Sequence, residues 1–524
     1  MESFQALKRR TTEILQSIPQ SLPQSVQSSK PTIPTMRGTW EKVDLPSLPR
    51  SSHTVDVVSG SAYIFGGEFN PRQPVNNDVH VINLPLSLSA SADSYPVKAT
   101  PPQKEGSSTS ANRQKGLTEV PLSGEDTATA TDLAEKDEAK QPEPEVPSGL
   151  GDVPPARVGH ASATIGSRIF VFGGRGGPDM TPLEESGRVW VFDTRNHTWT
   201  YLDPAPAAAG AVARFPPARS YHAAAAIDHP RDFPSDHRPK PATWHDWAMG
   251  DSAKVGIPQA PIVGNVAAGA VDEEDEGYGT FFIHAGCLAG GERANDIWGF
   301  DVRSKVWSEL PTPPGPARGG TSICVTKGKI FRFGGFDGKQ ELGGQVDVLH
   351  LDADFFDDVV SKGEVAVTTR HGWETLTPIP QTDTLDPDLW PAPRSVSSLL
   401  PVHVHGRDYL LLLMGEESPS SDGHNAAGTF LSDAWAFSIP TPHGGSIKDT
   451  VFSAIGRKAA SREGRWTQVT AEPYDDDVTD ELPSARGWIS AAVVDELEEP
   501  AVFLWGGVGD GNVRLGDGWI LRLG

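Results

Sequence analysis

Short apolar runs that end in a pair of glycines recur along the chain. Residues 63–65 and 170–172 are two such runs, and each is followed directly by Gly-Gly. A polar turn and an alternating segment come next, as in Asp78–Ile82 and Arg188–Asp193. Alternation with a period of two predicts half-buried strands. The pattern therefore predicts an all-β chain built from repeated four-stranded antiparallel sheets.

Each copy of this unit opens with an arginine that follows Pro or Ala. The openings lie near residues 49, 156, 218, 317, 393 and 485, at Arg50, Arg157, Arg219, Arg318, Arg394 and Arg486. The last copy lacks the tryptophan strand that closes most others, whereas Gly38–Val43 is a tryptophan strand with no copy before it. We expect this N-terminal strand to complete the last unit, which leaves no open sheet edge between the ends.

These units resemble kelch repeats, whose period of about 50 residues is typical of a β-propeller. The resemblance implies six four-stranded blades over residues 37–524. Residues 1–36 are expected to form a short helix and a flexible N-terminal extension. Residues 87–154 are rich in Ser, Thr, Pro, Glu and Ala, which predicts a disordered insertion. Two further insertions are expected, 228–279 in blade 3 and 440–464 in blade 5.

Charge and cysteine content restrict the partners and the compartment. The chain has 69 acidic and 45 basic residues, a formal net charge of −24, so we expect no nucleic-acid partner. No apolar run reaches the roughly 18–20 residues of a membrane span, and no secretory signal is evident. Cys287 and Cys324 lie in apolar runs and are expected to be buried thiols. We therefore expect a cytoplasmic protein without membrane contact, while its oligomeric state stays open.

Propeller topology gathers the candidate site residues on one face. The first two strands of a blade are antiparallel, so the opening arginines and the residues after the glycine pairs share that face. In so acidic a chain, arginines there predict a pocket for an anionic small molecule or an acidic peptide segment. The expected substrate-binding residues are Arg50, Glu68, Arg219, Arg318, Arg394, Arg486 and Trp488.

The alternative for each opening arginine is structural, because its guanidinium could hydrogen-bond loop carbonyls of the neighbouring blade. Three copies also carry a histidine three residues after the arginine. Strand alternation places this histidine on the opposite strand face from the arginine. We therefore expect these histidines to pack between blades: His53, His160 and His222.

The fifth copy replaces its glycine pair by Met414 and Gly415 and continues into a polar loop. Glu416, Asp422 and His424 in this loop are suitable ligands for iron(II), with Mn or Zn as weaker choices. An ordinary polar loop without a metal is the alternative. The loop lies on the same face as the arginines.

Several segments are similar to the plant specifier proteins, kelch proteins that redirect glucosinolate breakdown toward nitriles, epithionitriles or thiocyanates. The similar segments include Arg50–His53, Arg318–Gly320, Gly415–Glu416 with His424, and Arg486–Trp488. In that family the iron ligands follow the pattern Glu-x-x-x-Asp-x-x-x-His, which assigns Glu416 and His424. The middle acid is replaced here by Ser420, and Asp422 is the candidate substitute.

The resemblance implies an iron-dependent lyase or isomerase that rearranges an unstable sulfate-bearing aglycone. It further implies that arginines hold the anionic group, and the expected catalytic residues are Arg157 and Arg175. The alternative is a non-catalytic kelch scaffold that binds a partner segment on the same face. Fold alone favours neither function, because propellers host both.

Overall fold

The computed structural model describes residues 36–86, 91–102, 150–206, 214–228, 279–356, 364–377, 390–421, 426–440, 464–474 and 482–524. Within these ranges the chain forms β-strands and one short 3-10 turn at Asp510–Asn512. None of the described segments is a helix long and apolar enough to span a membrane. The helix expected in residues 1–36 lies outside the described residues, of which only Met36 belongs to that range.

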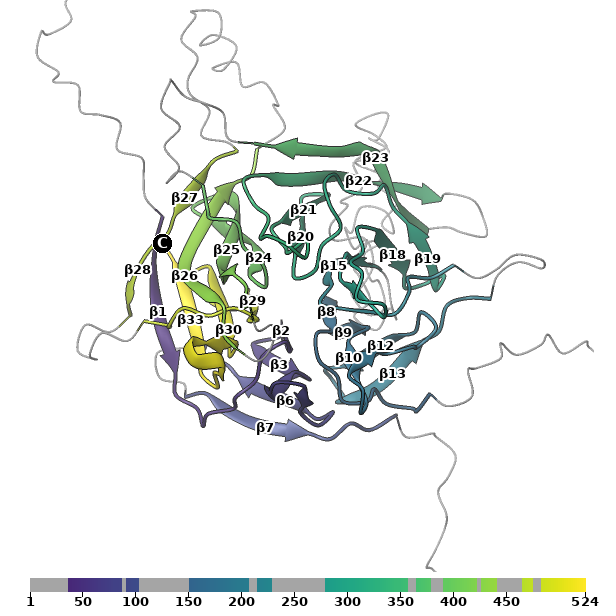
Figure 1. Cartoon of the computed structure of the whole chain (residues 1–524), viewed down its shortest axis with the longest axis horizontal. Helices are drawn as coiled ribbons and strands as arrows, with labels where there is room; N and C mark the ends of the chain where they lie inside the picture. Colours follow the sequence, from purple (N-terminus) through teal and green to yellow (C-terminus); the bar gives the residue numbers. More distant parts are fainter. Residues whose placement is uncertain are drawn as a thin grey trace, which may run out of the picture. The chain divides into compact units, whose positions relative to one another are not determined.

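Six antiparallel sheets stand around a common centre, which confirms the predicted six-bladed propeller (Figure 1). Blade 1 contains β2 (Thr54–Val58), β3 (Ser61–Phe65), β6 (Val79–Asn83) and β7 (Asp93–Val97). Blade 2 contains β8 (Ala161–Ile165), β9 (Arg168–Phe172), β12 (Val189–Asp193) and β13 (Thr198–Leu202). Blade 3 contains β15 (Ala223–Asp228), β16 (Gly279–His284), β18 (Ile297–Asp301) and β19 (Val306–Glu309).

The remaining blades follow the same order from the centre outward. Blade 4 contains β20 (Ser322–Thr326), β21 (Lys329–Phe333), β22 (Val346–Phe356) and β23 (Glu364–Leu376). Blade 5 contains β24 (Ser398–Val404), β25 (Arg407–Ser418), β26 (Thr429–Ser438) and β27 (Trp466–Gln468). Blade 6 starts with β29 (Ser490–Val494), β30 (Ala501–Trp505) and β33 (Gly518–Leu523). The innermost strand of every blade contacts those of both neighbours, so the ring is closed.

The N-terminal strand completes blade 6, as the sequence predicts. Strand β1 (Arg37–Val43) pairs antiparallel with β33, in the register Trp40↔Leu521. Its other edge pairs in parallel with β28 (Thr470–Pro473), which belongs to the connection from blade 5. The sequence analysis did not anticipate this fifth strand. Strand β1 is therefore held on both sides by segments from the C-terminal part of the chain.

The insertions fall between paired strands, with one correction. Strand β7, the outer strand of blade 1, lies inside the range 87–154 that was expected to be disordered. Residues 103–149 of that range lie outside the described residues. In blade 3, Asp228 pairs with Gly279, so residues 229–278 interrupt two adjacent strands. In blade 5, residues 441–463 fall between β26 and β27.

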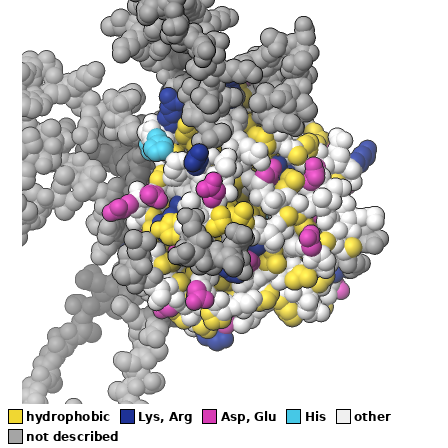
Figure 2. Space-filling view, turned by 90° about the vertical axis from the view of Figure 1, so that its left-hand side faces the viewer, with side chains coloured by type: hydrophobic (Ala, Val, Ile, Leu, Met, Phe, Trp, Pro, Cys, Tyr) yellow, Lys and Arg dark blue, Asp and Glu magenta, His cyan; other side chains and the backbone are white. Residues whose placement is uncertain are grey.

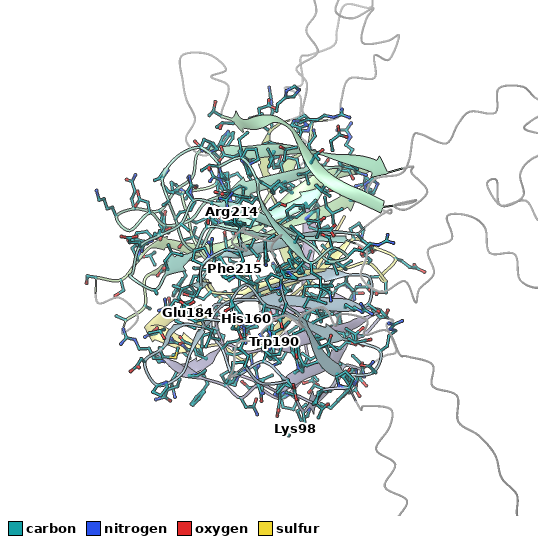
Figure 3. All side chains as sticks on the ribbon, turned by 90° about the vertical axis from the view of Figure 1, so that its right-hand side faces the viewer. Lys98, His160, Glu184, Trp190, Arg214 and Phe215 are labelled. Atoms are coloured by element: carbon teal, nitrogen blue, oxygen red, sulfur yellow. The ribbon has the colours of Figure 1, made fainter. Side chains whose placement is uncertain are left out.

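The core lies between neighbouring blades, where aromatic side chains and the predicted histidines pack. His160 of blade 2 is buried, its Nε2 lies 3.1 Å from Thr54 Oγ1 of blade 1, and its ring packs edge-on against Phe65. Figure 3 shows His160 and Trp190 in the interior of the ribbon and Lys98 at its lower edge. The His222 ring packs in the same way against Phe172. The prediction that these histidines pack between blades is confirmed.

The glycine pairs occur where one blade closely approaches the next. Gly66 and Gly67 have φ values of 59° and 89°, a left-handed conformation that favours glycine. A Cβ on Gly66 would lie 2.7 Å from the carbonyl oxygen of Arg157 in the next blade. The second residue of every pair donates its N–H to the backbone carbonyl of the next opening arginine, over 2.8–3.0 Å. The repeat of glycine pair and arginine thus joins the blades through their backbones.

A second ring of backbone hydrogen bonds surrounds the centre on the same face. Its six residues lie two positions after the opening arginines and have φ between 46° and 63°. Each N–H donates to the carbonyl of the corresponding residue in the preceding blade, over 2.6–3.1 Å. The members are Ser52, Gly159, Tyr221, Gly320, Val396 and Trp488. This ring fixes the backbone on which the candidate site stands.

Candidate functional site

The six opening arginines are buried and hold the turns of their own blades. Each is at most 3% exposed, and its Nη1 donates to the carbonyl of the first residue of the glycine pair. The acceptors are Gly66, Gly173, Ala285, Gly334, Met414 and Gly506. Their geometry matches the structural alternative, except that the carbonyl belongs to the same blade instead of the neighbouring one. The expected pocket lined by opening arginines is therefore not formed by their side chains.

Four of these guanidinium groups also form bidentate pairs with carboxylates. Arg157 binds Glu185 over 2.8 and 3.0 Å, and Glu185 accepts a further hydrogen bond from Trp190 Nε1. Arg219, Arg394 and Arg486 bind an aspartate that lies two residues before a tryptophan and also accepts its Nε1–H. These aspartates are Asp296, Asp433 and Asp517. The spacing Asp-x-Trp was the sequence signal that these arginines already have partners.

Arg157 and Arg175 were both expected to be catalytic, but in the structure their side chains have different surroundings. The Arg157 side chain is fully buried and its donors are directed at Glu185, Gly173 and Pro155. The side chains of Arg50 and Arg318 lack such a carboxylate pair among the described residues. Burial lowers the pKa of both arginines to about 10, and neither lines the cavity described next.

Two of the predicted site residues, Glu68 and Arg175, do come together. They line a cavity of about 150 Å³ on the predicted face, between blades 1, 2 and 3. Both follow a glycine pair, at the start of β4 (Glu68–Asn70) and β10 (Arg175–Gly176). The other lining residues, which the sequence pattern does not predict, are Arg72, Asp179, Met180 and Tyr221. Three of these belong to the turns that follow the glycine pairs, and Tyr221 is a member of the backbone ring.

Arg175 is the cation that is best placed to act in this cavity. Its Nε donates to Ser220 Oγ over 3.0 Å, and its guanidinium lies 4.9 Å from the centre of the Tyr221 ring. Neither Nη atom has a hydrogen-bond partner among the described residues. Stacking and the Nε contact thus fix the guanidinium plane, while its outer edge stays available to a ligand.

Glu68 is neutralised from the neighbouring blade. Its Oε1 accepts from Arg514 Nη2 over 2.5 Å, and its Oε2 accepts the backbone N–H of Arg72 over 2.9 Å. Because Arg514 compensates this carboxylate, Asp179, which is exposed, is the remaining acidic residue among those that line the cavity with Arg175 and Arg72. The cavity can therefore bind a negatively charged group, and the carboxylate of Asp179 lies at the edge of the cavity.

Tyr221 and Trp488 meet across the centre of the face. Their rings come from blades 3 and 6 and stand edge to face with centres 5.2 Å apart. Burial raises the pKa of Tyr221, so its phenol stays protonated in the neutral range. Trp488 was predicted to bind substrate, and the structure places it against Tyr221, which lines the cavity, and not in the cavity lining itself.

The expected metal loop is described only in part. Glu416 lies in β25 and is 7% exposed, whereas Asp422 and His424 lie outside the described residues. Burial raises the pKa of Glu416 to about 7, and its carboxylate has no hydrogen-bond partner in the described part of the chain. A desolvated, unpartnered carboxylate fits the needs of an iron(II) ligand. The described residues alone contain no group of three His, Cys, Asp or Glu that could hold a metal ion.

The side of the molecule that carries β1, β27 and β28 shows no comparable concentration of one charge. Figure 2 views the side of the molecule on which β1, β27 and β28 lie, and charged groups of both signs are scattered there among hydrophobic ones. The cavity, in which Arg175 and Arg72 lie with Asp179, is therefore the strongest candidate for recognition among the described residues.

The match to the kelch motif agrees with the fold. The model of the kelch motif matches residues 156–206, which is the second blade. The N-(sulfonatooxy)prop-2-enimidothioate sulfolyase of Thlaspi arvense is 21% identical over 419 residues, which cover 78% of this chain and 83% of that protein. Acyl-CoA-binding domain-containing protein 4 of Arabidopsis thaliana is 27% identical over 159 residues, 29% of this chain and 23% of its own. The solved structure of YjhT aligns with 92% of this chain and 99% of its own at 10% identity, with a TM-score of 0.46.

Proposed function

We propose that this protein, a kelch-repeat propeller that is similar to a specifier-type sulfolyase, binds an anionic small molecule in the cavity beside Arg175. The observation that carries the proposal is the orientation of this guanidinium, which is fixed by Ser220 and Tyr221 and has both Nη atoms unpartnered among the described residues. A planar fork of this kind suits bidentate binding of a carboxylate, sulfate or phosphate. Arg72 adds a second positive charge at the cavity edge.

The lining indicates how such an anion would be held. The protonated Tyr221 offers a phenol beside Arg175, and Met180 contributes an apolar wall. Asp179 disfavours a second negative charge at the mouth, because like charges repel. A monoanion with an uncharged remainder is therefore the ligand that this cavity favours.

The relative from Thlaspi arvense is named as a sulfolyase of a sulfonatooxy enimidothioate. We extend the proposal to a specifier-like lyase that takes a sulfate-bearing substrate, with the sulfate at Arg175. Glu416, Asp422 and His424 would hold iron(II), which would supply a Lewis acid for a soft sulfur group when bound. In this reaction Arg175 would position the sulfate end of the substrate, because Ser220 and Tyr221 hold its guanidinium in place. A cytoplasmic location is part of the proposal and is supported by two cysteines that form no disulfide in the described strands.

Calorimetric titration with sodium sulfate and with phenyl sulfate, at constant ionic strength, tests the proposal. We expect Arg175→Ala to weaken binding of phenyl sulfate about 10- to 100-fold, because a hydrogen bond to a charged group contributes about 1.5–3 kcal/mol. Arg214→Ala is the matched control, since Arg214 (Figure 3) is exposed and pairs only with Glu309. Equal affinities for the wild type and Arg175→Ala would contradict the anion site and favour the interaction scaffold.

A further inference from the structure

On the face of the propeller that carries the glycine pairs, the residue after each pair forms a β-bridge with a residue further along the chain, and this pairing repeats in several blades. In blade 6, Val508 pairs with Arg514, and in blade 4 the equivalent residue Phe336 pairs with Glu341. Val508 and Phe336 both follow a glycine pair. Arg514 and Glu341 therefore occupy equivalent positions in their blades, and each side chain reaches the following blade.

The two side chains meet equivalent partners there. Arg514 binds Glu68, the residue after the glycine pair of blade 1. Glu341 reaches blade 5, where the residue at that position is Glu416. The equivalent positions thus hold a guanidinium and a carboxylate at the junction of blades 6 and 1, but two carboxylates, Glu341 and Glu416, at the junction of blades 4 and 5. Arg293 lies over the Phe336 ring and slightly offsets the rise that burial causes in the pKa of Glu341, but within the described residues no cation forms an ion pair with either carboxylate at the second junction.

Ser395 connects the two carboxylates. Its Oγ donates to Glu341 Oε1 over 3.2 Å, and its backbone exchanges two hydrogen bonds of 2.9 and 3.0 Å with Glu416. Residues paired in this way direct their side chains to the same side of the strands. The carboxylate of Glu416 therefore lies on the side on which Ser395 contacts Glu341.

Both carboxylates have unused oxygens in a largely buried place. Glu416 is 7% exposed and has no hydrogen-bond or ion-pair partner among the described residues. Glu341 Oε2 is inaccessible to solvent and also lacks a partner. Buried charges are costly unless they are paired or coordinate a metal. The free oxygen of Glu341 and the carboxylate of Glu416 have no cation partner among the described residues, so a bound cation would be favourable between them.

We propose that Glu341 and Glu416 bind a divalent cation between blades 4 and 5, at the place that the guanidinium of Arg514 takes between blades 6 and 1. Oxygen ligands suit magnesium, calcium, manganese and iron(II). Glu341 then supplies, from the neighbouring blade, the carboxylate that the loop lacks at Ser420. The inference depends on the proposed function only in that Glu416 is shared with the proposed iron site, and it does not depend on the anion cavity.

Manganese(II) binding to the full chain tests this site, with free ion followed by electron paramagnetic resonance and iron(II) added anaerobically as competitor. We expect one ion per wild-type chain and an affinity at least tenfold lower in both Glu341→Gln and Glu416→Gln. Glu417→Gln is the control, since Glu417 is the exposed neighbour of Glu416 and should bind like the wild type. In Glu341→Arg, which copies the pair of Arg514 and Glu68, we expect a higher melting temperature without metal and no further rise when manganese is added.

Each result separates the hypotheses. Wild-type affinity in Glu341→Gln together with lost affinity in Glu416→Gln would overturn the role of Glu341 and leave the loop as the metal site. No manganese or iron(II) binding by the wild type would overturn both the inference and the iron part of the proposed function. The anion cavity is tested separately by Arg175→Ala, so either proposal can fail alone.

Discussion

Replacing Glu185 by alanine removes the carboxylate that neutralises Arg157 in the interior of blade 2. Arg157 is fully buried, and the pair is joined by hydrogen bonds of 2.8 and 3.0 Å. The substitution leaves this guanidinium with the carbonyl oxygens of Gly173 and Pro155 and deprives Trp190 Nε1 of its acceptor. A buried cation without a counter-charge is costly, because it cannot return to water in the folded state.

The expected loss in unfolding free energy is about 3–5 kcal/mol, the range found when one partner of a buried ion pair is removed. Glu41→Ala is the matched control. Glu41 binds Arg522 over 2.7 Å, but both side chains are partly exposed, so its removal should cost at most about 1 kcal/mol. The double variant Arg157→Met with Glu185→Leu should recover most of the loss, because apolar pairs often replace buried ion pairs without cost.

Urea unfolding followed by tryptophan fluorescence measures these differences, and calorimetry with phenyl sulfate measures the binding of each variant. The structural role of Arg157 predicts that Glu185→Ala binds phenyl sulfate like the wild type under conditions where it is folded. A variant with unchanged urea midpoint and weakened sulfate binding would refute the reasoning, because Arg157 would then act on the ligand as the sequence analysis expected.

Two further predictions concern a buried acid and the backbone ring. Ser162 Oγ donates a hydrogen bond to the carboxylate of Asp56 over 2.6 Å, and burial raises the pKa of Asp56 to about 7. The native state therefore binds the carboxyl proton of Asp56 more tightly than the unfolded chain does. The unfolding free energy should accordingly fall as the pH rises from about 4 to about 7. In urea titrations across this pH range, Asp56→Asn should show a smaller fall than the wild type. Equal pH dependence in the two proteins would contradict this prediction. A Cβ on Gly159 (φ +63°) would lie 2.5 Å from the Tyr221 ring, so Gly159→Ala should displace this ring and weaken phenyl sulfate binding in calorimetry. Gly166→Ala has a similar φ of +58° but open space around it, so it should destabilise the fold without changing affinity, and equal affinities in both variants would contradict the proposed site.

The fold could be predicted from the sequence because the repeat contains residues that require a particular backbone conformation. Glycine pairs mark left-handed turns, and the degenerate pairs that begin with Ala285 and Met414 keep the same conformation, with φ values of 63° and 53°. The N-terminal strand could be placed by counting tryptophan strands. Strand β28 could not, because a four-residue parallel strand in a connection has no distinctive pattern.

The candidate site was harder to predict, because side-chain partners come from other strands. The arginine ring suggested free cations, yet Arg219, Arg394 and Arg486 are neutralised by acids from another part of the same blade. These acids lie in the third strand or directly before it. Glu68 and Arg175 were predicted because they follow glycine pairs directly. Arg72 and Asp179 depend on the path of the turns beyond them, which the sequence does not specify. Whether Asp422 and His424 bind a metal stays a prediction.

The ring of six backbone hydrogen bonds around the centre has a consequence for how this protein could be altered. Its members are as different as glycine, serine, valine, tyrosine and tryptophan, yet their backbones adopt the same conformation and the same bonds. Because the bonds use only backbone atoms, the side chains here can vary while the blades stay joined. A combinatorial library at Ser52, Val396 and Trp488 would therefore sample new ligand selectivities on an unchanged framework, with asparagine and glycine favoured by the positive φ.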